Sequence, residues 1–153
     1  MKVEFWMIGK TTESYLKEGV EHYEKRIQRY LPFEMKVFPA SRAKNASAQM
    51  EAEKDRITKA LKPNDQLIIL DETGSVYTSQ AFAAFLQKWF NESTQRLIFL
   101  AGGAYGIHET LQNQAKAQLA LSPMTFPHEL IRVVFLEQLY RGLTIINNEP
   151  YHH

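Results

Sequence analysis

Five short apolar runs alternate along the chain with segments in which apolar residues recur every three or four positions. The runs lie at residues 3–8, 34–38, 66–71, 97–101 and 118–121. Short apolar runs are typical of buried strands, and apolar residues that recur every three or four positions are typical of amphipathic helices. This alternation predicts an α/β fold in one domain, residues 1–153, with a mostly parallel sheet covered by helices on both faces. The order of the strands cannot be read from the pattern.

Several element boundaries follow from local residue types. The first helical pattern extends from Thr12 to Leu31, where the following proline ends it. Ser47 is expected to cap the second helix, and Thr78 or Ser79 the third. Residues 72–75, which follow the third and most apolar strand, are expected to form a turn.

The last helix is predicted to begin at Pro127, because proline is favoured at the first helical position. Its apolar residues cover most of its circumference: Leu130, Ile131, Val133, Val134, Phe135, Leu136, Leu139, Tyr140 and Leu143. One core cannot absorb all of them. The helix therefore either lies at the centre of the domain or packs against a second copy, and we favour a twofold homodimer.

Composition narrows the class of protein. The 153 residues are 44% hydrophobic and 23% charged, which suits one globular domain with a sizeable core. The net charge of +1 gives no overall basic field, although Arg42 and Lys44 could contact phosphates. The absence of cysteine excludes disulfides and thiolate chemistry and suits a reducing compartment. The apolar run at the N-terminus is too short for a signal peptide or membrane span, so we expect a soluble cytoplasmic protein with no membrane partner.

A glycine-rich turn, Gly102-Gly103-Ala104-Tyr105-Gly106, follows the fourth strand. Its backbone N–H groups could face a phosphate or a cofactor, or its glycines could serve only a tight turn with positive φ. It is not a P-loop, because no Lys-Ser/Thr pair follows it. It also fits a dinucleotide fingerprint poorly, because the spacing differs and residues 119–125 hold no acid for a ribose hydroxyl. Together with the loop before the last helix, this turn predicts a ligand crevice.

The segment from His128 to Arg132 nearly matches the zinc-protease pattern HExxH. Arg132 stands where the second histidine ligand is required, so no metal site is expected. His128 and Arg132 lie four residues apart near a helix N-terminus, where an anionic substrate is favoured. The alternative is that Arg132 pairs with Glu129 or Glu137 inside the protein. Glu137 and Arg141 are interpreted as a structural pair.

The chain ends in an unusual polar and aromatic tail, residues 147–153. Tyr151 beside His152 could stack on a base and handle a proton. The alternative is a frayed terminus or the remnant of a purification tag.

Five segments carry a resemblance that covers essentially the whole chain. They are VEFWMIGK, LIILDETG, LIFLAGGAYGI, ALSPMTFPHELIRVVFLEQLYRG and EPYHH. In this order and spacing they resemble the RlmH family of ribosomal RNA large-subunit methyltransferases, within the SPOUT class. The resemblance implies methyl transfer from S-adenosylmethionine to N3 of a pseudouridine in large-subunit (23S) ribosomal RNA, on assembled ribosomes, by a homodimer. It also implies a C-terminal trefoil knot, which general rules of chain threading would not suggest.

The resemblance also assigns the cofactor site. The implied cofactor-binding residues are Leu70, Gly102, Leu121, Ser122, Pro123, Met124, Thr125 and Phe126. For the reaction, His128 and His152 are candidate bases, Arg132 could hold RNA phosphate or stabilise negative charge on the target base, and Tyr151 could stack on it. Two other functions stay open at this point: a nicotinamide oxidoreductase, and a non-catalytic ribosome-binding or assembly protein.

Overall fold

The computed structural model describes residues 1–153, in which five strands alternate with five helices. In chain order they are β1 (Lys2–Ile8), α1 (Ser14–Ile27), β2 (Phe33–Phe38), α2 (Ala46–Ala60), β3 (Gln66–Val76), α3 (Ser79–Asn91), β4 (Arg96–Ala101), α4 (Glu109–Gln114), β5 (Ala117–Ala120) and α5 (Leu130–Ile146). The predicted alternation is confirmed.

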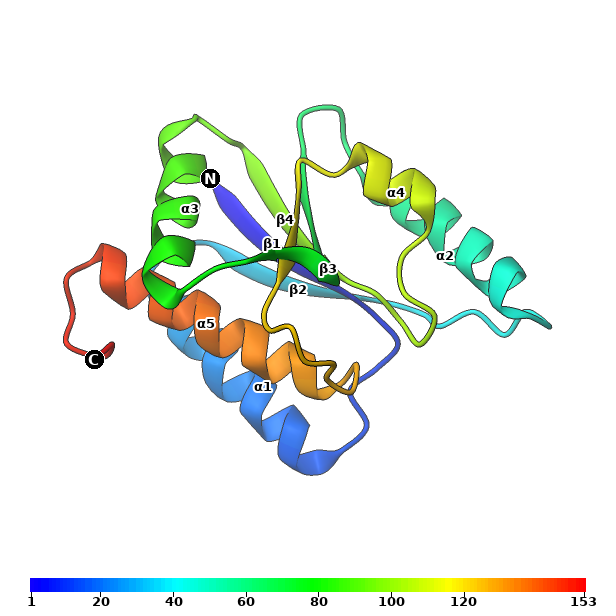
Figure 1. Ribbon diagram of the computed structural model, residues 1–153, viewed down its shortest axis with the longest axis horizontal. Helices are drawn as coiled ribbons and strands as arrows, with labels where there is room; N and C mark the ends of the chain where they lie inside the picture. Colours follow the sequence, from blue (N-terminus) through cyan, green and yellow to red (C-terminus); the bar gives the residue numbers. More distant parts are fainter.

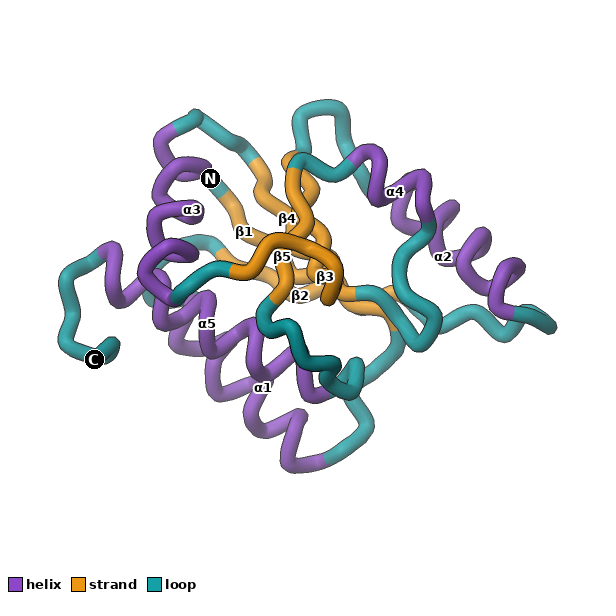
Figure 2. The backbone as a smooth tube through the Cα atoms, in the orientation of Figure 1, coloured by secondary structure: helices purple, strands orange, loops and turns teal.

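The strands form one sheet in the order β2-β1-β4-β3-β5, and every neighbouring pair is parallel. Helices α1, α3 and α5 cover one face, and α2 and α4 cover the other (Figure 1). The α/β fold with both faces covered is therefore confirmed, whereas the trefoil knot stays a prediction. The loops that leave the carboxyl ends of the strands gather at one edge of the sheet (Figure 2).

Side chains that alternate along each strand build a separate core on each face of the sheet. In β1, Phe5 and Met7 join a cluster of 20 buried residues with α1, α3 and α5. Trp6 and Ile8 point the other way, into a cluster of 10 buried residues with α2 and α4. Strands buried on both faces explain why the apolar runs are nearly continuous in the sequence.

Helix α5 lies between α1 and α3, and none of its residues is exposed. Phe135, Leu136, Leu139 and Leu143 point into the larger core. The helix is therefore central on its face of the sheet, which was one of the two arrangements expected from its apolar circumference. The homodimer stays a prediction. No helix is both long and apolar enough to cross a membrane.

The helix starts differ in detail from the prediction. The Asn45 side chain, rather than that of Ser47, caps α2 by accepting a hydrogen bond from the Ala48 N–H at 2.8 Å. Asparagine is at least as good a cap as serine, so the earlier residue in the sequence took the role. The Thr78 cap of α3 is confirmed, with its hydroxyl 3.0 Å from the Ala81 nitrogen.

Two helices are shorter than expected. Helix α1 ends at Ile27 rather than Leu31, because the residue before Pro32 avoids helical geometry and the last turn loosens ahead of it. Helix α5 begins at Leu130. The Pro127 carbonyl accepts a hydrogen bond from the Ile131 N–H at 3.1 Å, so a single turn precedes the regular helix.

The prediction of a turn at residues 72–75 is wrong, because β3 continues to Val76. Its pairing with β5 shifts between Leu70 and Ser75, so the residues between them form an irregularity inside the strand. Gly74 permits this pairing. A Cβ atom there would lie 2.6 Å from the backbone carbon of Gln118.

Candidate functional site

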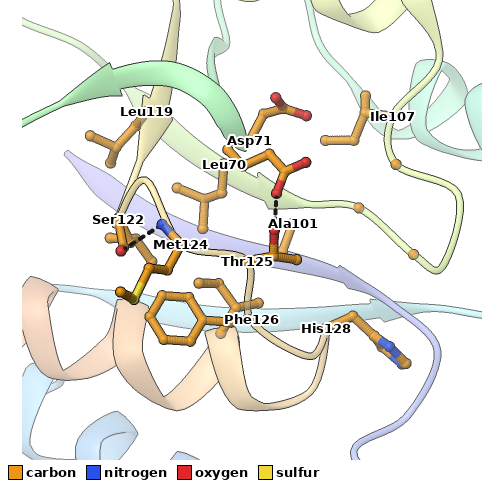
Figure 3. A pocket seen from close by; sticks show the side chains of 16 residues that line it. Leu70, Asp71, Ala101, Ile107, Leu119, Ser122, Met124, Thr125, Phe126 and His128 are labelled. Atoms are coloured by element: carbon orange, nitrogen blue, oxygen red, sulfur yellow. Dashed lines mark hydrogen bonds between the residues drawn. The ribbon is translucent and has the colours of Figure 1, made fainter.

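The middle of β3 (residues 70–72), the carboxyl end of β4 and the loop before α5 enclose a cleft (Figure 3). The cleft has a volume of about 210 Å³ and opens to solvent at its mouth. The walls are formed by Leu70, Asp71, Glu72, Ala101, Gly102, Gly103, Gly106, Ile107, Leu119, Leu121, Ser122, Met124, Thr125, Phe126, His128 and Ile131.

The glycine turn forms one wall with its backbone. Gly106 has a φ of +83°, and its N–H donates to the Gly103 carbonyl at 3.1 Å. A Cβ atom on Gly102 would lie 2.8 Å from Cγ1 of Ile107 and 2.9 Å from the Gly106 carbonyl carbon. The predicted positive φ is thus confirmed at Gly106, while Gly102 is needed for close approach. A backbone without side chains is left facing the cleft.

The loop of residues 121–126 forms the opposite wall. The Ser122 hydroxyl accepts a hydrogen bond from the Met124 N–H at 3.0 Å. The Thr125 hydroxyl donates to the Glu72 carboxylate at 2.6 Å, which ties the loop to β3 (Figure 3). Met124 is 77% exposed at the mouth. The loop is therefore held in shape by its own residues and by one contact across the cleft.

The ionisable side chains of the walls are Asp71, Glu72 and His128, and no lysine or arginine is among them. The sequence interpretation missed the two acids because it placed Glu72 in a turn. Their position directly after the apolar part of the third strand was the available signal, since ligands bind beyond the carboxyl ends of parallel strands.

His128 lies at the edge of the cleft, whereas Arg132 is only 1% exposed. The Arg132 guanidinium donates to the Ile8 carbonyl at 2.8 Å and to the Thr11 hydroxyl at 2.9 Å, and its Nε has no partner. Burial lowers the pKa of Arg132, and the Glu129 carboxylate partly offsets this. In this position Arg132 fastens the end of β1 to α5.

The alternative in which Arg132 forms an ion pair with Glu129 or Glu137 is wrong. Glu129 instead accepts hydrogen bonds from the backbone N–H of Thr12 and from its hydroxyl, the latter at 2.8 Å. These bonds hold the pKa of Glu129 below its usual value. Glu129 and Arg132 thus hold the loop after β1 from two sides.

The tail is packed against α5, so the alternative interpretation of the tail as a frayed terminus is wrong. The Tyr151 hydroxyl donates to Oε1 of Glu137 at 3.1 Å, and its ring centroid lies 4.7 Å from the Arg141 guanidinium carbon. Nδ1 of His152 lies 3.3 Å from Nη1 of Arg141. The structural pair of Glu137 and Arg141 is confirmed, with Nε of Arg141 3.0 Å from Oε1 of Glu137. Burial and the hydrogen bond to Glu137 raise the pKa of Tyr151 to about 12.

The structure brings most of the predicted site residues together. The cleft walls contain Leu70, Gly102, Leu121, Ser122, Met124, Thr125, Phe126 and His128. Pro123 is exposed and does not line the cleft. Tyr151 and His152 lie beside Glu137 and Arg141, at least two helical turns (about 10 Å) along α5 from its start at the cleft. Their roles in binding and catalysis stay predictions.

A sequence-family profile described as "Predicted SPOUT methyltransferase" matches residues 1–152. The chain belongs to the SPOUT methyltransferase family. It is an S-adenosylmethionine-dependent methyltransferase. The two alternative functions, a nicotinamide oxidoreductase and a non-catalytic ribosome-binding or assembly protein, are therefore wrong.

Curated relatives match over their whole length. "Ribosomal RNA large subunit methyltransferase H" of Parabacteroides distasonis is 45% identical over 100% of this chain and 99% of its own. The protein of the same name from Cytophaga hutchinsonii is 44% identical over 100% of both chains. Among solved structures, a probable methyltransferase from Bordetella pertussis Tohama I covers 93% of this chain and 96% of its own, with a TM-score of 0.57 and 14% identity, which supports the fold alone.

The cleft residues fit S-adenosylmethionine. Leu70, Ile107 and Leu121 would provide apolar walls for a flat adenine ring, and Gly102 would leave backbone groups open to it. Asp71 and Glu72 suit a ligand that carries positive charge. The same two acids, with no basic residue beside them, oppose a cofactor that carries phosphates.

Proposed function

We propose that this chain transfers a methyl group from S-adenosylmethionine to N3 of a pseudouridine in large-subunit (23S) ribosomal RNA, on assembled ribosomes in the cytoplasm. The single observation that carries the proposal is the full-length identity of 45% to a relative named "Ribosomal RNA large subunit methyltransferase H". The cleft, with backbone and acids at the carboxyl edge of the sheet, supports it. Residues 1–153 act as one domain in this proposal.

Positioning is the main task of the protein in this reaction. The cofactor supplies a methyl group that is already activated by the positive charge on its sulfur, so no metal is needed. Holding the methyl group in line with the attacking nitrogen can contribute about 7–11 kcal/mol. The glycine turn and the loop of residues 121–126 are the elements that hold one side of this arrangement, because both are fixed by hydrogen bonds within the chain.

The attacking N3 is an imide nitrogen that must lose its proton, and a base could contribute roughly 10²–10⁴-fold. Of the two candidate histidines, His128 is the one that lines the cleft of its own chain. A tyrosine keeps its proton at neutral pH even at its ordinary pKa, and the pKa of Tyr151 is raised further, to about 12. Its proposed role is therefore to stack on the target ring. Arg132 is buried where it joins the end of β1 to α5, so its proposed role is to contribute positive potential toward the RNA rather than a direct phosphate contact.

A homodimer through α5 would bring the tail to the reaction. Tyr151 and His152 lie away from the cleft of their own chain, so they reach a cleft only across a subunit interface. Val133, Val134 and Ile145 on α5 are only partly buried in one chain and could be covered by a second copy. Mixing Gly102→Ala subunits with His152→Ala subunits tests this, at a cofactor concentration at which neither variant alone transfers methyl. Shared sites predict that some activity returns, and separate sites predict none.

The net charge favours a folded target over free RNA. At +1, the chain lacks the basic field that binds single RNA strands tightly, so it depends on the shape of its substrate. The test is transfer of labelled methyl from S-adenosylmethionine to intact ribosomes, free large subunits and naked ribosomal RNA. Label on ribosomes but not on naked RNA is expected. Label on none of them, despite cofactor binding, would contradict the proposed substrate.

A further inference from the structure

The cleft has an unbalanced charge. Asp71 and Glu72 both line it, and neither carboxylate lies within 4 Å of a lysine or arginine nitrogen. The partners that these acids do have are neutral. Asp71 accepts a hydrogen bond from the Thr73 N–H at 2.8 Å, and Glu72 accepts one from the Thr125 hydroxyl at 2.6 Å. Neutral donors hold the carboxylates in place without cancelling their charge.

The two forms of the cofactor differ in charge as well as in one methyl group. S-adenosylmethionine carries an ammonium, a carboxylate and a positively charged sulfonium, so its net charge is positive. When the methyl group leaves for the RNA nitrogen, the sulfur keeps the electron pair of the broken bond and becomes a neutral thioether. The nitrogen gives up its proton to a base or to water. The product, S-adenosylhomocysteine, therefore has no net charge.

We propose that Asp71 and Glu72 are specificity-determining residues that select the sulfonium form of the cofactor over the product. This inference rests on the proposed cofactor site. Both acids act on the sulfonium charge through space. The ammonium and the carboxylate are common to both forms of the cofactor, so they do not distinguish one form from the other. Loss of the sulfonium charge on methyl transfer removes this attraction, which favours release of the product and its exchange for fresh cofactor.

The expected effect is modest, because the mouth of the cleft is open to water. Coulomb attraction between unit charges a few side-chain lengths apart, with the screening of a partly exposed site, corresponds to about a three- to tenfold change in affinity for each carboxylate. The attraction should weaken with added salt. The product, having no net charge, should show little salt dependence.

The experiment is isothermal titration of the full chain with S-adenosylmethionine, S-adenosylhomocysteine and sinefungin, which carries an amine in place of the methylated sulfonium. Glu72→Gln removes the charge and still offers an oxygen to the Thr125 hydroxyl. It is expected to weaken both cationic ligands about three- to tenfold while the affinity for S-adenosylhomocysteine changes less than about twofold. Asp71→Asn is expected to act in the same direction.

Two matched variants separate charge from structure. Thr125→Val removes the hydrogen bond to Glu72 but keeps the carboxylate, so it should change the affinity for all three ligands by similar factors. Glu92→Gln removes one negative charge at the C-terminal end of α3, outside the cleft, and should leave all three affinities unchanged.

Each outcome decides the proposal. Equal weakening of all three ligands in Glu72→Gln and Asp71→Asn, or selective weakening in Thr125→Val, would show that the contacts rather than the charges matter and would overturn it. If the unaltered chain bound neither S-adenosylmethionine nor S-adenosylhomocysteine, the cofactor site itself would be misplaced. That result would contradict the proposed function along with this inference.

Discussion

Replacing Gly74 by alanine tests the unexpected continuation of β3. A Cβ atom at this position would lie 2.6 Å from the backbone carbon of Gln118, 2.7 Å from its oxygen and 2.8 Å from the nitrogen of Leu119. All three are backbone atoms, so no flexible side chain can move aside. The added methyl group must push β5 away from β3 by several tenths of an ångström.

The two interpretations of this glycine predict opposite signs. In a solvent-exposed turn without positive φ, Gly→Ala stabilises by about 0.4–1 kcal/mol, because it restricts the unfolded chain. In the observed strand pair, overpacking costs about 1–3 kcal/mol. For a domain of this size each kcal/mol moves Tm by about 2–4 °C, so we expect Tm to fall by roughly 2–12 °C.

Thermal and urea unfolding of Gly74→Ala measure this difference directly. Gly106→Ala is the companion variant, because its Cβ would meet nothing within 4 Å and only the backbone strain at φ +83° would be felt. That strain corresponds to about 1–2 kcal/mol. An unchanged or higher Tm for Gly74→Ala would refute the pairing of Ser75 and Val76 with β5.

Three further predictions follow from single contacts. Gly102→Ala should weaken S-adenosylmethionine binding at least about tenfold by titration calorimetry, because its Cβ cannot fit beside Ile107 without moving the turn. Burial raises the pKa of Asp65, but hydrogen bonds from the Arg96 side chain and from a backbone N–H lower it by more. The pKa of Asp65 in the folded protein is therefore below its ordinary value of 3.8. The stability from this depressed pKa is present above about pH 3.8 and is lost as the pH falls through the folded value. Asp65→Asn should therefore lose about 1–3 kcal/mol at neutral pH in urea unfolding and flatten the acid limb of a pH series. Tyr151→Phe, which removes the hydrogen bond to Glu137, should lower stability by about 0.5–1.5 kcal/mol and make tail amides exchange faster with solvent.

The sequence predicted the elements whose signal is local. Strands such as Leu97–Ala101 are apolar on both faces, so the sheet and its covering helices could be expected before any contact was known. The two cleft loops could be expected too, because both follow strands and precede helices. The full extent of β3 could not, since it depends on backbone contact between Gly74 and a strand more than forty residues away.

The candidate site likewise contains residues that could be predicted from the sequence and residues that could not. The residues of the loop from Leu121 to Phe126 were predicted through the family resemblance, and all but Pro123 line the cleft. Arg132 was expected to face the RNA, but it is buried against β1. This burial could not be predicted, because the spacing of residues along a helix does not show how many neighbours surround each position. Whether Tyr151 and His152 reach a cleft depends on a second copy, which no property of one chain determines.

The most direct test of the proposed function is the position of the methyl group after reaction. Ribosomes from a strain that lacks this methyltransferase would be incubated with the chain and S-adenosylmethionine, and nuclease digests of their RNA analysed by mass spectrometry. We expect the mass of one added methyl group on a single large-subunit fragment, located at N3 of a pseudouridine. Methylation of small-subunit RNA, of ribosomal protein or of no component would contradict it.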